Sequence, residues 1–289
     1  MEEALKRLAV LMTVHNRRET TLKCLSALES SVYNQEQYAI DLFITDDGCT
    51  DGTAKAVAEA FPLVHLIPGD GNLFWNRGMY KAWESAAHDD YDYYFWVNDD
   101  TLIIKDSLAR MLNCSRKRLD EAIIVGSTEA SDGSGTITYG GWSGLTAWKN
   151  GILVTDINEE QVCQTMNGNL VLIPQKVFNI LGKNDPYYHH SLGDFDYGLR
   201  ATEKGISIII TPGVCGICDL HEKPSAWMDP SQPIKKRWRC FFSPTGNNPF
   251  EYFHFKNRHF GLLSAFLSFG TNFLHFFFPS LWIESKSSE

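Results

Sequence analysis

An aromatic run at residues 93–97 ends on an amide and two adjacent carboxylates, Asn98, Asp99 and Asp100. Five apolar residues in a row suit a strand that is buried on both faces of a parallel sheet. Ligands of open α/β sheets bind just beyond the carboxyl ends of the strands, so this acidic tip predicts a binding site. Adjacent carboxylates repel each other, and Mg²⁺ or Mn²⁺ would relieve that repulsion while holding phosphate oxygens. The alternative is that Asp99 and Asp100 cap the following helix.

A second carboxylate pair, Asp46-Asp47, ends the apolar run at residues 40–45. No G-x-G-x-x-G follows the first apolar run, and no G-x-x-x-x-G-K-[ST] occurs anywhere in the sequence. A site that binds diphosphate without a glycine cradle or a lysine needs a metal to offset the phosphate charge. Carboxylates can also accept hydrogen bonds from ribose hydroxyls and from the N–H groups of a base. The strand ends therefore predict a metal-assisted diphosphate site.

The elements expected around these carboxylates alternate along the first hundred residues. Apolar runs predict buried strands, and apolar residues that recur every three or four positions predict amphipathic helices. The expected strands are residues 8–14, 40–45, 64–67 and 93–97, and the helical patterns cover 22–28, 54–61 and 79–86. This order implies right-handed crossovers and an α/β fold with a mainly parallel central sheet flanked by helices.

After residue 100 the regular alternation of strand and helix patterns ends, although no clear linker separates the two parts of the sequence. A stretch rich in Gly, Ser, Thr and Trp at residues 131–150 suits short antiparallel hairpins and loops. Three further strands are expected at residues 122–126, 170–173 and 206–210, and helices through 177–181 and over 193–204 with Gly205 as a stop. We therefore expect one domain over residues 1–232 and a helical appendage over residues 233–289.

Charge and cysteine usage limit the class of protein. The net charge of −9 and the pI near 5.5 argue against a nucleic-acid binder. The seven cysteines are scattered, and the C-x-x-C at residues 215–218 has no second pair, so a zinc or redox site is not expected. Residues 1–7 lack the basic-then-apolar order of a secretory signal. These features predict a cytoplasmic protein with free thiols and no nucleic-acid partner.

Several segments, taken in order, resemble motifs of the family 2 glycosyltransferases of the GT-A fold, in particular those of a bacterial surface-polysaccharide type. Residues 46–53 read D-D-G-C-T-D-G-T, which resembles the family's D-D-G-S-x-D-G-T. Residues 69–79 are similar to a G-N-L-x-W-x-x-x-M segment, and Asn98-Asp99-Asp100 stands where the metal-binding D-x-D belongs. The opening loop, the acceptor loop and the helix of the catalytic base find counterparts at residues 13–17, 166–169 and 190–200.

The resemblance implies a nucleotide-binding half, residues 1–100, and an acceptor and catalytic half, residues 101–232. Its donor would be a nucleoside diphosphate sugar bound by Thr13, His15, Asn16, Asp46, Asp47, Asn72, Arg77, Asn98 and Asp99. Because the first position of D-x-D is Asn98, Asp100 is the expected ligand of the Mg²⁺ or Mn²⁺ cofactor. His221 is a further candidate, since some GT-A enzymes use a downstream histidine, although a lone histidine is more often a surface or packing residue.

The resemblance also implies a catalytic base. An inverting transfer needs one group to take the proton from the acceptor hydroxyl, and Asp194 occupies the position of that base, with Gly193 where the family usually has Glu. The alternative for Asp194 is a helix N-cap. The residues that would face the acceptor are Asn167, Asn169, His190 and Asp196, although for Asp196 an i, i+4 ion pair with Arg200 on an exposed helix face is favoured.

The C-terminal appendage combines basic and apolar residues. Residues 235–239 are a basic run with one tryptophan, and residues 260–283 are dominated by Phe and Leu. That length could just span a bilayer, but Asn272 and His275 in its middle favour amphipathic helices lying in the membrane interface. The alternatives are packing on the main domain and a homodimer contact.

The resemblance, together with the acidic strand ends, implies a metal-dependent, inverting transferase that moves a sugar from a nucleoside diphosphate to a glycan or lipid-linked glycan. The expected setting is surface polysaccharide or lipopolysaccharide synthesis, at the inner face of the cell membrane. One alternative is a sugar-nucleotide nucleotidyltransferase, which generally has a glycine-rich, basic loop that residues 13–18 do not supply. Another is a catalytically silent sugar-nucleotide-binding protein of the same fold.

Overall fold

The computed structural model describes residues 5–32, 38–220 and 226–279. The strands are β1 (Lys6–Val14), β2 (Tyr38–Asp46), β3 (His65–Pro68), β4 (Tyr93–Val97), β5 (Leu102–Ile103), β6 (Ile123–Glu129), β7 (Ile137–Tyr139), β8 (Gly141–Leu145), β9 (Asn150–Leu153), β10 (Gln161–Cys163), β11 (Thr165–Met166), β12 (Leu170–Pro174) and β13 (Ile208–Ile217). The helices are α1 (Arg18–Val32), α2 (Thr53–Ala60), α3 (Phe74–Ala86), α4 (Ser107–Lys117), α5 (Gln175–Leu181), α6 (Gly193–Glu203), α7 (Ile234–Phe241), α8 (Pro249–Phe260) and α9 (Leu262–Phe277).

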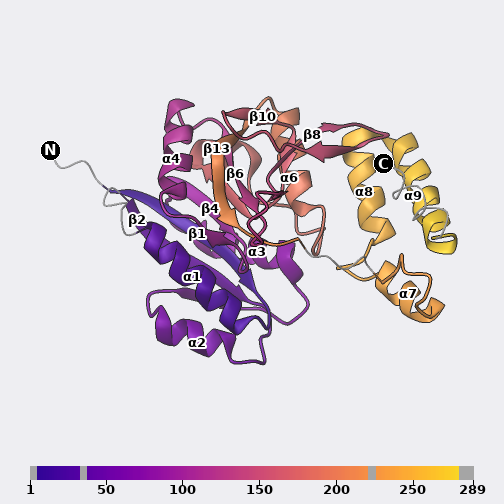
Figure 1. Ribbon diagram of the computed structural model, residues 1–289, viewed down its shortest axis with the longest axis horizontal. Helices are drawn as coiled ribbons and strands as arrows, with labels where there is room; N and C mark the ends of the chain where they lie inside the picture. Colours follow the sequence, from indigo (N-terminus) through magenta and orange to yellow (C-terminus); the bar gives the residue numbers. More distant parts are fainter. Residues whose placement is uncertain (1–4, 33–37, 221–225, 280–289) are drawn as a thin grey trace.

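The first half of the chain forms the parallel part of a central sheet (Figure 1). Strands β3, β2, β1 and β4 lie side by side in that order, and every pairing among them is parallel. The alternation of strands and helices predicted from residues 8–97 is therefore confirmed. All four carboxyl ends lie at one edge of the sheet, which is where the two aspartate pairs were expected to meet.

The second half extends the same sheet with mixed strand directions. β12 runs antiparallel between β4 and β6, and β13 then pairs with β6 in the parallel direction. Because β12 runs opposite to β4, its amino end lies beside the carboxyl end of β4, where Leu170 pairs with Val97. The residues just before β12 are thereby brought to the acidic edge. The hairpins expected at residues 131–150 include β8 and β9, which form a second, small sheet with β11.

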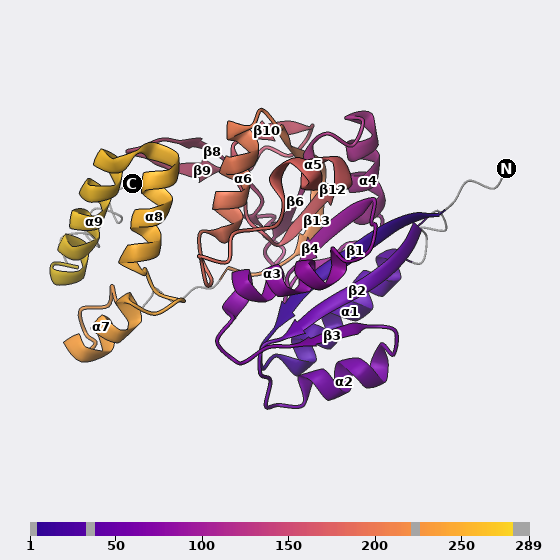
Figure 2. The same cartoon turned by 180° about the vertical axis from the view of Figure 1, so that it is seen from behind.

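Helices cover both faces of the central sheet (Figures 1 and 2). Alternate residues of β4 point to opposite faces, as a pleated strand requires. Phe95 belongs to the hydrophobic cluster that includes residues of α1, α2 and α4 on one face, and Trp96 belongs to the cluster that includes residues of α3, α5 and α6 on the other. All five residues of β4 are buried, so this strand is the centre of both cores.

Helix α4 was not predicted from the sequence. It covers the α1 side of the sheet and buries Leu108, Met111, Leu112 and Ser115, which follow the i, i+3, i+4, i+7 spacing of an amphipathic helix. The helix begins abruptly, because its N-cap, Asp106, has a left-handed φ of 66° and makes no capping hydrogen bond with its side chain. Both helix signals were nevertheless present in the sequence, since Asp106 and Ser107 are residue types that favour N-caps and the apolar spacing follows them.

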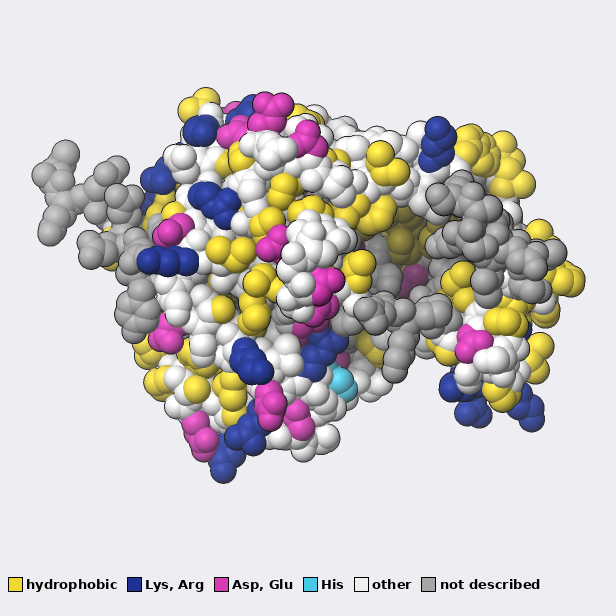
Figure 3. Space-filling view, in the orientation of Figure 1, with side chains coloured by type: hydrophobic (Ala, Val, Ile, Leu, Met, Phe, Trp, Pro, Cys, Tyr) yellow, Lys and Arg dark blue, Asp and Glu magenta, His cyan; other side chains and the backbone are white. Residues whose placement is uncertain are grey.

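The predicted C-terminal helices are present as α7, α8 and α9, which lie together at one end of the molecule (Figure 2). Helix α8 packs on the main domain through Phe255, which clusters with Tyr188 and Leu199. Helices α7 and α9 meet through Phe241 and Phe276. Hydrophobic side chains lie on the outer surface at this end (Figure 3). Among the described residues, no helix has the length and apolarity needed to cross a bilayer.

Candidate active site

A pocket of about 610 Å³ opens at the edge of the sheet where β1 and β4 end and β12 begins. It brings together residues from both predicted halves. Those that were named from the sequence are Thr13, His15, Asp47, Asn98, Asp99, Asp100, Asn167, Asn169, His190 and Asp194. Arg17, Gly71, Phe74, Trp75, Tyr139, Gly168, Ser191, Leu192, Phe195, Cys218 and Thr245 complete the wall.

A guanidinium group lies between the two carboxylates at the acidic tip. Arg17 Nη1 is 3.1 Å from Asp99 Oδ1 and 2.7 Å from Asp100 Oδ2. Asp99 is 7% exposed, and burial together with the neighbouring Asp100 raises its pKa to about 7, against the opposing effect of Arg17. Arg17 therefore offsets part of the repulsion between Asp99 and Asp100. From the sequence, only a metal ion was expected to do this. Arg17 was not among the predicted site residues, although its position in the loop after β1 places it at the same edge.

The tip is also fixed by an amide. Asn98 Oδ1 accepts a hydrogen bond of 2.6 Å from Trp75 Nε1, and the backbone N–H of Asn98 donates to the carbonyl of Asn169 at 3.2 Å. The Trp75 ring stands edge-on to Trp96, with 5.8 Å between the ring centroids. Asn98 thus orients an aromatic wall of the pocket, a task that an aspartate at this position could also perform.

The donor set at the tip fits a metal that takes most of its ligands from a substrate. Among the residues that the structure describes, no three or more His, Cys, Asp or Glu side chains converge in a way that could hold an ion. Asp100 and Asp99 supply carboxylate oxygens, which suit Mg²⁺ or Mn²⁺ when diphosphate and water provide the remaining ligands. The sulfur of Cys218 lies 3.7 Å from Asp100 Oδ1, but burial raises the pKa of this thiol to about 12, so it stays protonated. His221 lies outside the described residues.

Asp47 organises the pocket loop by capping α3. Its carboxylate accepts hydrogen bonds from the backbone N–H groups of Gly71, Leu73 and Phe74, at 2.9 to 3.2 Å. Its carbonyl oxygen lies 2.6 Å from His15 Nδ1. Because the carboxylate is only 2% exposed and already holds three amides, Asp47 shapes the site through the loop at residues 71–74.

Four of the predicted donor residues are bonded to other parts of the chain and do not line the pocket. Asp46 accepts from the backbone of Cys49, and Asn16 accepts from Thr50, so the two loops after β1 and β2 are tied together. Asn72 is bonded to Asp70. Arg77 was expected to pair with phosphate, but it donates to the carbonyls of residues 186 and 187. None of the four is among the residues that line the pocket described above.

Asp194 lies in the first turn of α6 and lines the pocket. Its Oδ2 accepts from the backbone N–H of Gly168 at 3.0 Å, and its Oδ1 accepts from that of Phe195 at 2.8 Å. Burial raises its pKa to about 6, against the opposing effect of these amides. A carboxylate with a pKa near neutrality, fixed in orientation and open to a pocket, is suited to general base catalysis. The carboxylate also holds helix α6 to the loop before β12, so it performs part of the role of a cap.

Two glycines let the aromatic wall and the base approach each other. A Cβ on Gly168 would lie 2.3 Å from the Trp75 ring, and a Cβ on Gly193 would lie 2.0 Å from Asn76 Oδ1. Asn76 is fully buried and donates to the carbonyls of residues 185 and 188, both at 2.8 Å. The glycine at position 193, where the resemblance suggests Glu, thus has a local cause, because Asn76 fills the space.

The loops that carry the expected acceptor residues are held by hydrogen bonds. Asn167 Oδ1 accepts from Trp142 Nε1 at 2.7 Å, and Asn169 Nδ2 donates to Thr101 Oγ1 at 3.3 Å. His190 stands edge-on to Phe74, with 6.4 Å between the ring centroids. Phe74 and Leu192 have left-handed φ values of 57° and 70°. Such strained, non-glycine residues persist where the surrounding structure enforces them, and they are frequent at functional sites.

The comparison with known families decides the class of this site. The model of the family described as Glycosyl transferase family 2 matches residues 9–178, more than half of the chain. This chain belongs to glycosyl transferase family 2. It is therefore a glycosyltransferase, and enzymes of this family use nucleotide sugars as donors. No curated protein matches the chain.

Solved structures of other glycosyltransferases share the fold. A mannosyltransferase from Pyrobaculum calidifontis, PcManGT in complex with GDP-Man and Mn²⁺, matches 91% of this chain and 74% of its own, with a TM-score of 0.55 and 14% identity. GalNAc-T7, solved with UDP, GalNAc and Mn²⁺, matches 83% of this chain at a TM-score of 0.55 and 14% identity, and this chain spans 48% of that one. At such identity the likeness supports the GT-A fold of this family 2 glycosyltransferase and nothing finer.

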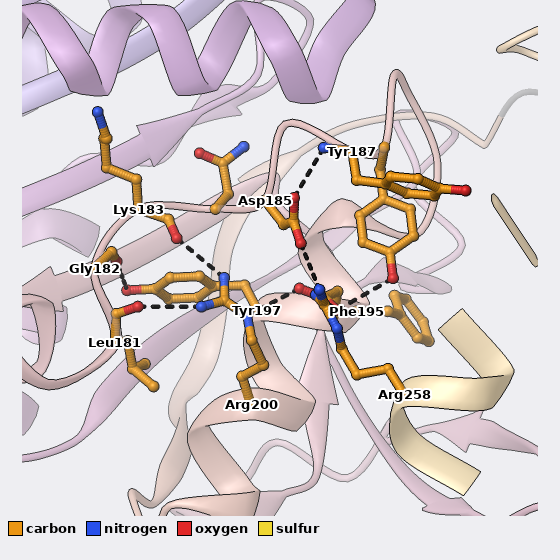
Figure 4. Close-up of polar contacts among 12 residues, drawn as sticks. Leu181, Gly182, Lys183, Asp185, Tyr187, Phe195, Tyr197, Arg200 and Arg258 are labelled. Atoms are coloured by element: carbon orange, nitrogen blue, oxygen red, sulfur yellow. Dashed lines mark hydrogen bonds and ion pairs between the residues drawn. The ribbon is translucent and has the colours of Figure 1, made fainter. Parts of the chain in front are cut away.

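Asp196 of this glycosyltransferase lies outside the pocket, in a buried ion network. Its two arginine partners, Arg200 and Arg258, are labelled in Figure 4. The Asp196 carboxylate is 2.9 Å from Arg200 Nε and 2.7 Å from Arg258 Nη1, and Tyr188 and His259 also bond to it. Although burial alone would raise the pKa of Asp196, the His259 hydrogen bond and the two arginines lower it to about 2. The ion pair with Arg200 was expected, but the face that carries it is buried. The carboxylate is bonded within this network, so the structure places Asp196 apart from the other expected acceptor residues, Asn167, Asn169 and His190, which line the pocket.

Proposed function

We propose that this chain is a metal-assisted, inverting glycosyltransferase that moves a sugar from a nucleoside diphosphate onto a hydroxyl of a glycan. The observation that carries the proposal is a single pocket lined by the acidic tip and by Asp194. One end of the pocket offers oxygen ligands and a guanidinium, and Asp194 offers a base with a raised pKa.

The acidic tip is proposed to hold the diphosphate. Asp100, together with Asp99, would bind Mg²⁺ or Mn²⁺, which when bound neutralises charge on the leaving diphosphate. Arg17 keeps both carboxylates in place and adds a fixed positive charge at the same point. His15 and Thr13 line the pocket beside the tip and are proposed to contact the nucleotide.

Asp194 is proposed to accept the proton of the attacking hydroxyl. The acceptor oxygen forms a bond with the anomeric carbon as the bond between that carbon and the diphosphate oxygen breaks, and the proton moves to the Asp194 carboxylate. One carboxylate at this position is enough for a single displacement, which inverts the configuration. Asn167, Asn169 and His190 line the same pocket and are proposed to bound the acceptor side.

The finer assignment follows the resemblance stated from the sequence. We propose a glycan or lipid-linked glycan as acceptor, in surface polysaccharide or lipopolysaccharide synthesis at the inner face of the cell membrane, with a homodimer as a further option. The two structural neighbours were solved with GDP-Man and with UDP and GalNAc, so GDP-sugars and UDP-sugars are the first donors to test.

The test is release of nucleoside diphosphate from each nucleotide sugar, with and without Mn²⁺. The wild-type chain should release nucleoside diphosphate from one donor class in the presence of metal. No acceptor is required, because water can slowly attack the donor in place of the acceptor hydroxyl. Asp156→Asn, an exposed carboxylate away from the pocket, is the matched control and should behave as wild type. A protein that binds a nucleotide sugar tightly but releases no nucleoside diphosphate, with or without an acceptor, would be a catalytically silent binder. That result would contradict the proposal.

A further inference from the structure

Helix α9 exposes large apolar side chains on its outward side, while its buried side mixes small and polar residues with one phenylalanine, Phe276. The buried positions are Ser264, Ala265, Asn272 and Phe276. The exposed positions define the α9 outer face, which consists of Leu262, Leu263, Phe266, Leu267, Leu274, Phe277 and Phe278. An ordinary surface helix has the opposite arrangement, with its apolar stripe toward the core.

The residues of the α9 outer face are strongly exposed, and three of them, Leu267, Leu274 and Phe278, also line a groove between α9 and neighbouring elements. Leu263 is 69% exposed, Phe266 60% and Leu274 58%. The surface continues onto α8, where Phe250 is 58% exposed and its ring lies 6.0 Å from that of Phe269. Figure 3 shows the hydrophobic side chains at this end of the molecule. An exposed apolar surface of this kind marks a site of association rather than a surface that stays in water.

A basic edge lies on a helix next to α9. Helix α7 exposes Lys235, Lys236 and Arg239, which we term the α7 basic edge. Six of the seven charged residues between positions 233 and 278 are basic, although the whole chain carries a net charge of −9. Trp238 on the same helix is 46% exposed, and its ring lies 5.5 Å from that of Phe276 on α9. Basic charge and a half-exposed tryptophan therefore lie on the helix that packs against α9.

We propose that the α9 outer face and the α7 basic edge dock on the surface of an anionic lipid bilayer. Leucine and phenylalanine side chains would enter the boundary between headgroups and acyl chains, with α9 lying along the surface. The lysines and arginine would pair with anionic headgroups, and tryptophan favours that depth. With 16 residues, α9 is too short to span a bilayer, which agrees with a helix that lies in the interface.

The docking surface is joined firmly to the catalytic pocket. Thr245, in the loop between α7 and α8, lines the pocket. Glu251 at the start of α8 lies 2.5 Å from His189 Nδ1, and Arg258 near its end binds Asp185 and Asp196 at 2.7 Å. Docking would therefore hold the pocket in a fixed position relative to the membrane. Its use for a lipid-borne acceptor rests on the proposed function, whereas the docking itself does not.

The test is co-sedimentation of the full chain with vesicles of phosphatidylcholine alone and of phosphatidylcholine with phosphatidylglycerol. The wild-type chain should bind the anionic vesicles more tightly, and salt should weaken that binding. Leu263→Gln, Leu267→Gln and Leu274→Gln together should reduce affinity by at least about tenfold. Lys235→Gln, Lys236→Gln and Arg239→Gln together should reduce it on the order of 100-fold on anionic vesicles, since each basic residue near such a surface contributes about a factor of five.

The matched control replaces three exposed apolar residues far from α9, by Leu63→Gln, Leu119→Gln and Ile180→Gln, and should bind as wild type. Absence of wild-type binding to anionic vesicles would overturn the proposal, as would an equal loss in this control. A dimer in solution that the α9 variant dissociates, without any vesicle binding, would overturn it in favour of a contact between two copies. Release of nucleoside diphosphate from the nucleotide sugar is measured in parallel, so a failure of the proposed function can be distinguished from a failure of docking.

Discussion

Asp194 is held in one orientation and still retains a high affinity for a proton. Two backbone amides fix its oxygens, and such bonds ordinarily lower the pKa of a carboxylate. Burial has the larger effect and raises the pKa to about 6. At neutral pH the group is therefore ionised, yet it can take a proton during the reaction.

Replacing this carboxylate by an amide removes the base at nearly constant volume, although its single oxygen replaces only one of the two acceptors that hold the N–H groups of Gly168 and Phe195. We expect Asp194→Asn to lower the transfer rate by about 10³-fold, since the amide cannot accept a proton. Nucleotide affinity should stay nearly unchanged, because the acidic tip lies on other loops. Single-turnover transfer assays and nucleotide titrations measure the two effects separately. Unchanged turnover in this variant would refute the assignment of the base.

The raised pKa of Asp194 also predicts a pH dependence. Below about pH 6 the carboxylate is protonated, so the rate should fall about tenfold per pH unit, and it should level off above about pH 7. A profile of kcat/KM between pH 5 and pH 8 measures this step, which should be missing from the residual activity of Asp194→Asn. A wild-type profile that stays flat across this range would argue that another group takes the proton.

At the level of elements, the pocket depends on how closely α6 approaches α3. Gly193 opens α6, and Asn76 on α3 occupies the space beside it. Asn184 also donates to Asn76 Oδ1, at 2.7 Å, so this amide is locked and cannot move aside. The contact decides where the first turn of α6, and with it Asp194, stands.

We expect Gly193→Ala to lower the free energy of unfolding by about 1–3 kcal/mol, because the added methyl would overlap a buried, hydrogen-bonded amide. Activity should fall as well, since Asp194 is the next residue. Denaturant titration measures the first effect. Gly270→Ala is the matched control, because its methyl would meet nothing within 4 Å in a helix, and it should be neutral or slightly stabilising. Equal stability of the two variants would contradict this account.

The sequence predicted what depends on local pattern. Apolar runs located the strands that end in the pocket, and the acidic pairs after them correctly indicated one edge of the sheet. It did not predict the partners of these groups, because they are distant in the chain. Arg17 meets Asp100 across 83 residues, and Asn76 meets the loop before α6 across more than a hundred. The strand β12 was predicted, but its antiparallel direction was not, since an apolar run does not show in which direction a strand runs.

On the scale of the whole molecule, one ion network joins the C-terminal helices to the catalytic helix. Arg258 on α8 reaches Asp196 on α6, and Asp196 is fully buried. The second arginine, Arg200, donates in addition to the carbonyls of Leu181, at the end of α5, and of Lys183, in the connection to α6. The appendage is therefore a structural part of the enzyme rather than a separate tail.

Removing the cation from α8 should loosen this joint. We expect Arg258→Met to destabilise the chain by about 2–3 kcal/mol, because Asp196 would keep Arg200 but lose part of the charge that compensates its burial. Urea titration measures this loss. Arg239→Met, an exposed cation on α7, is the control and should change stability little. If both variants unfold at the same urea concentration, the network does not hold the appendage.

The central claim is that the acidic edge of the sheet binds a nucleoside diphosphate together with a metal. It is tested most directly by a thermal-shift panel of UDP, GDP, dTDP and CMP, each with and without Mn²⁺. We predict that one nucleotide raises the unfolding temperature, that the rise requires the metal, and that Asp100→Ala abolishes it. No shift with any nucleotide in well-folded protein would mean that the carboxylates at the strand ends are structural only, and it would contradict the account.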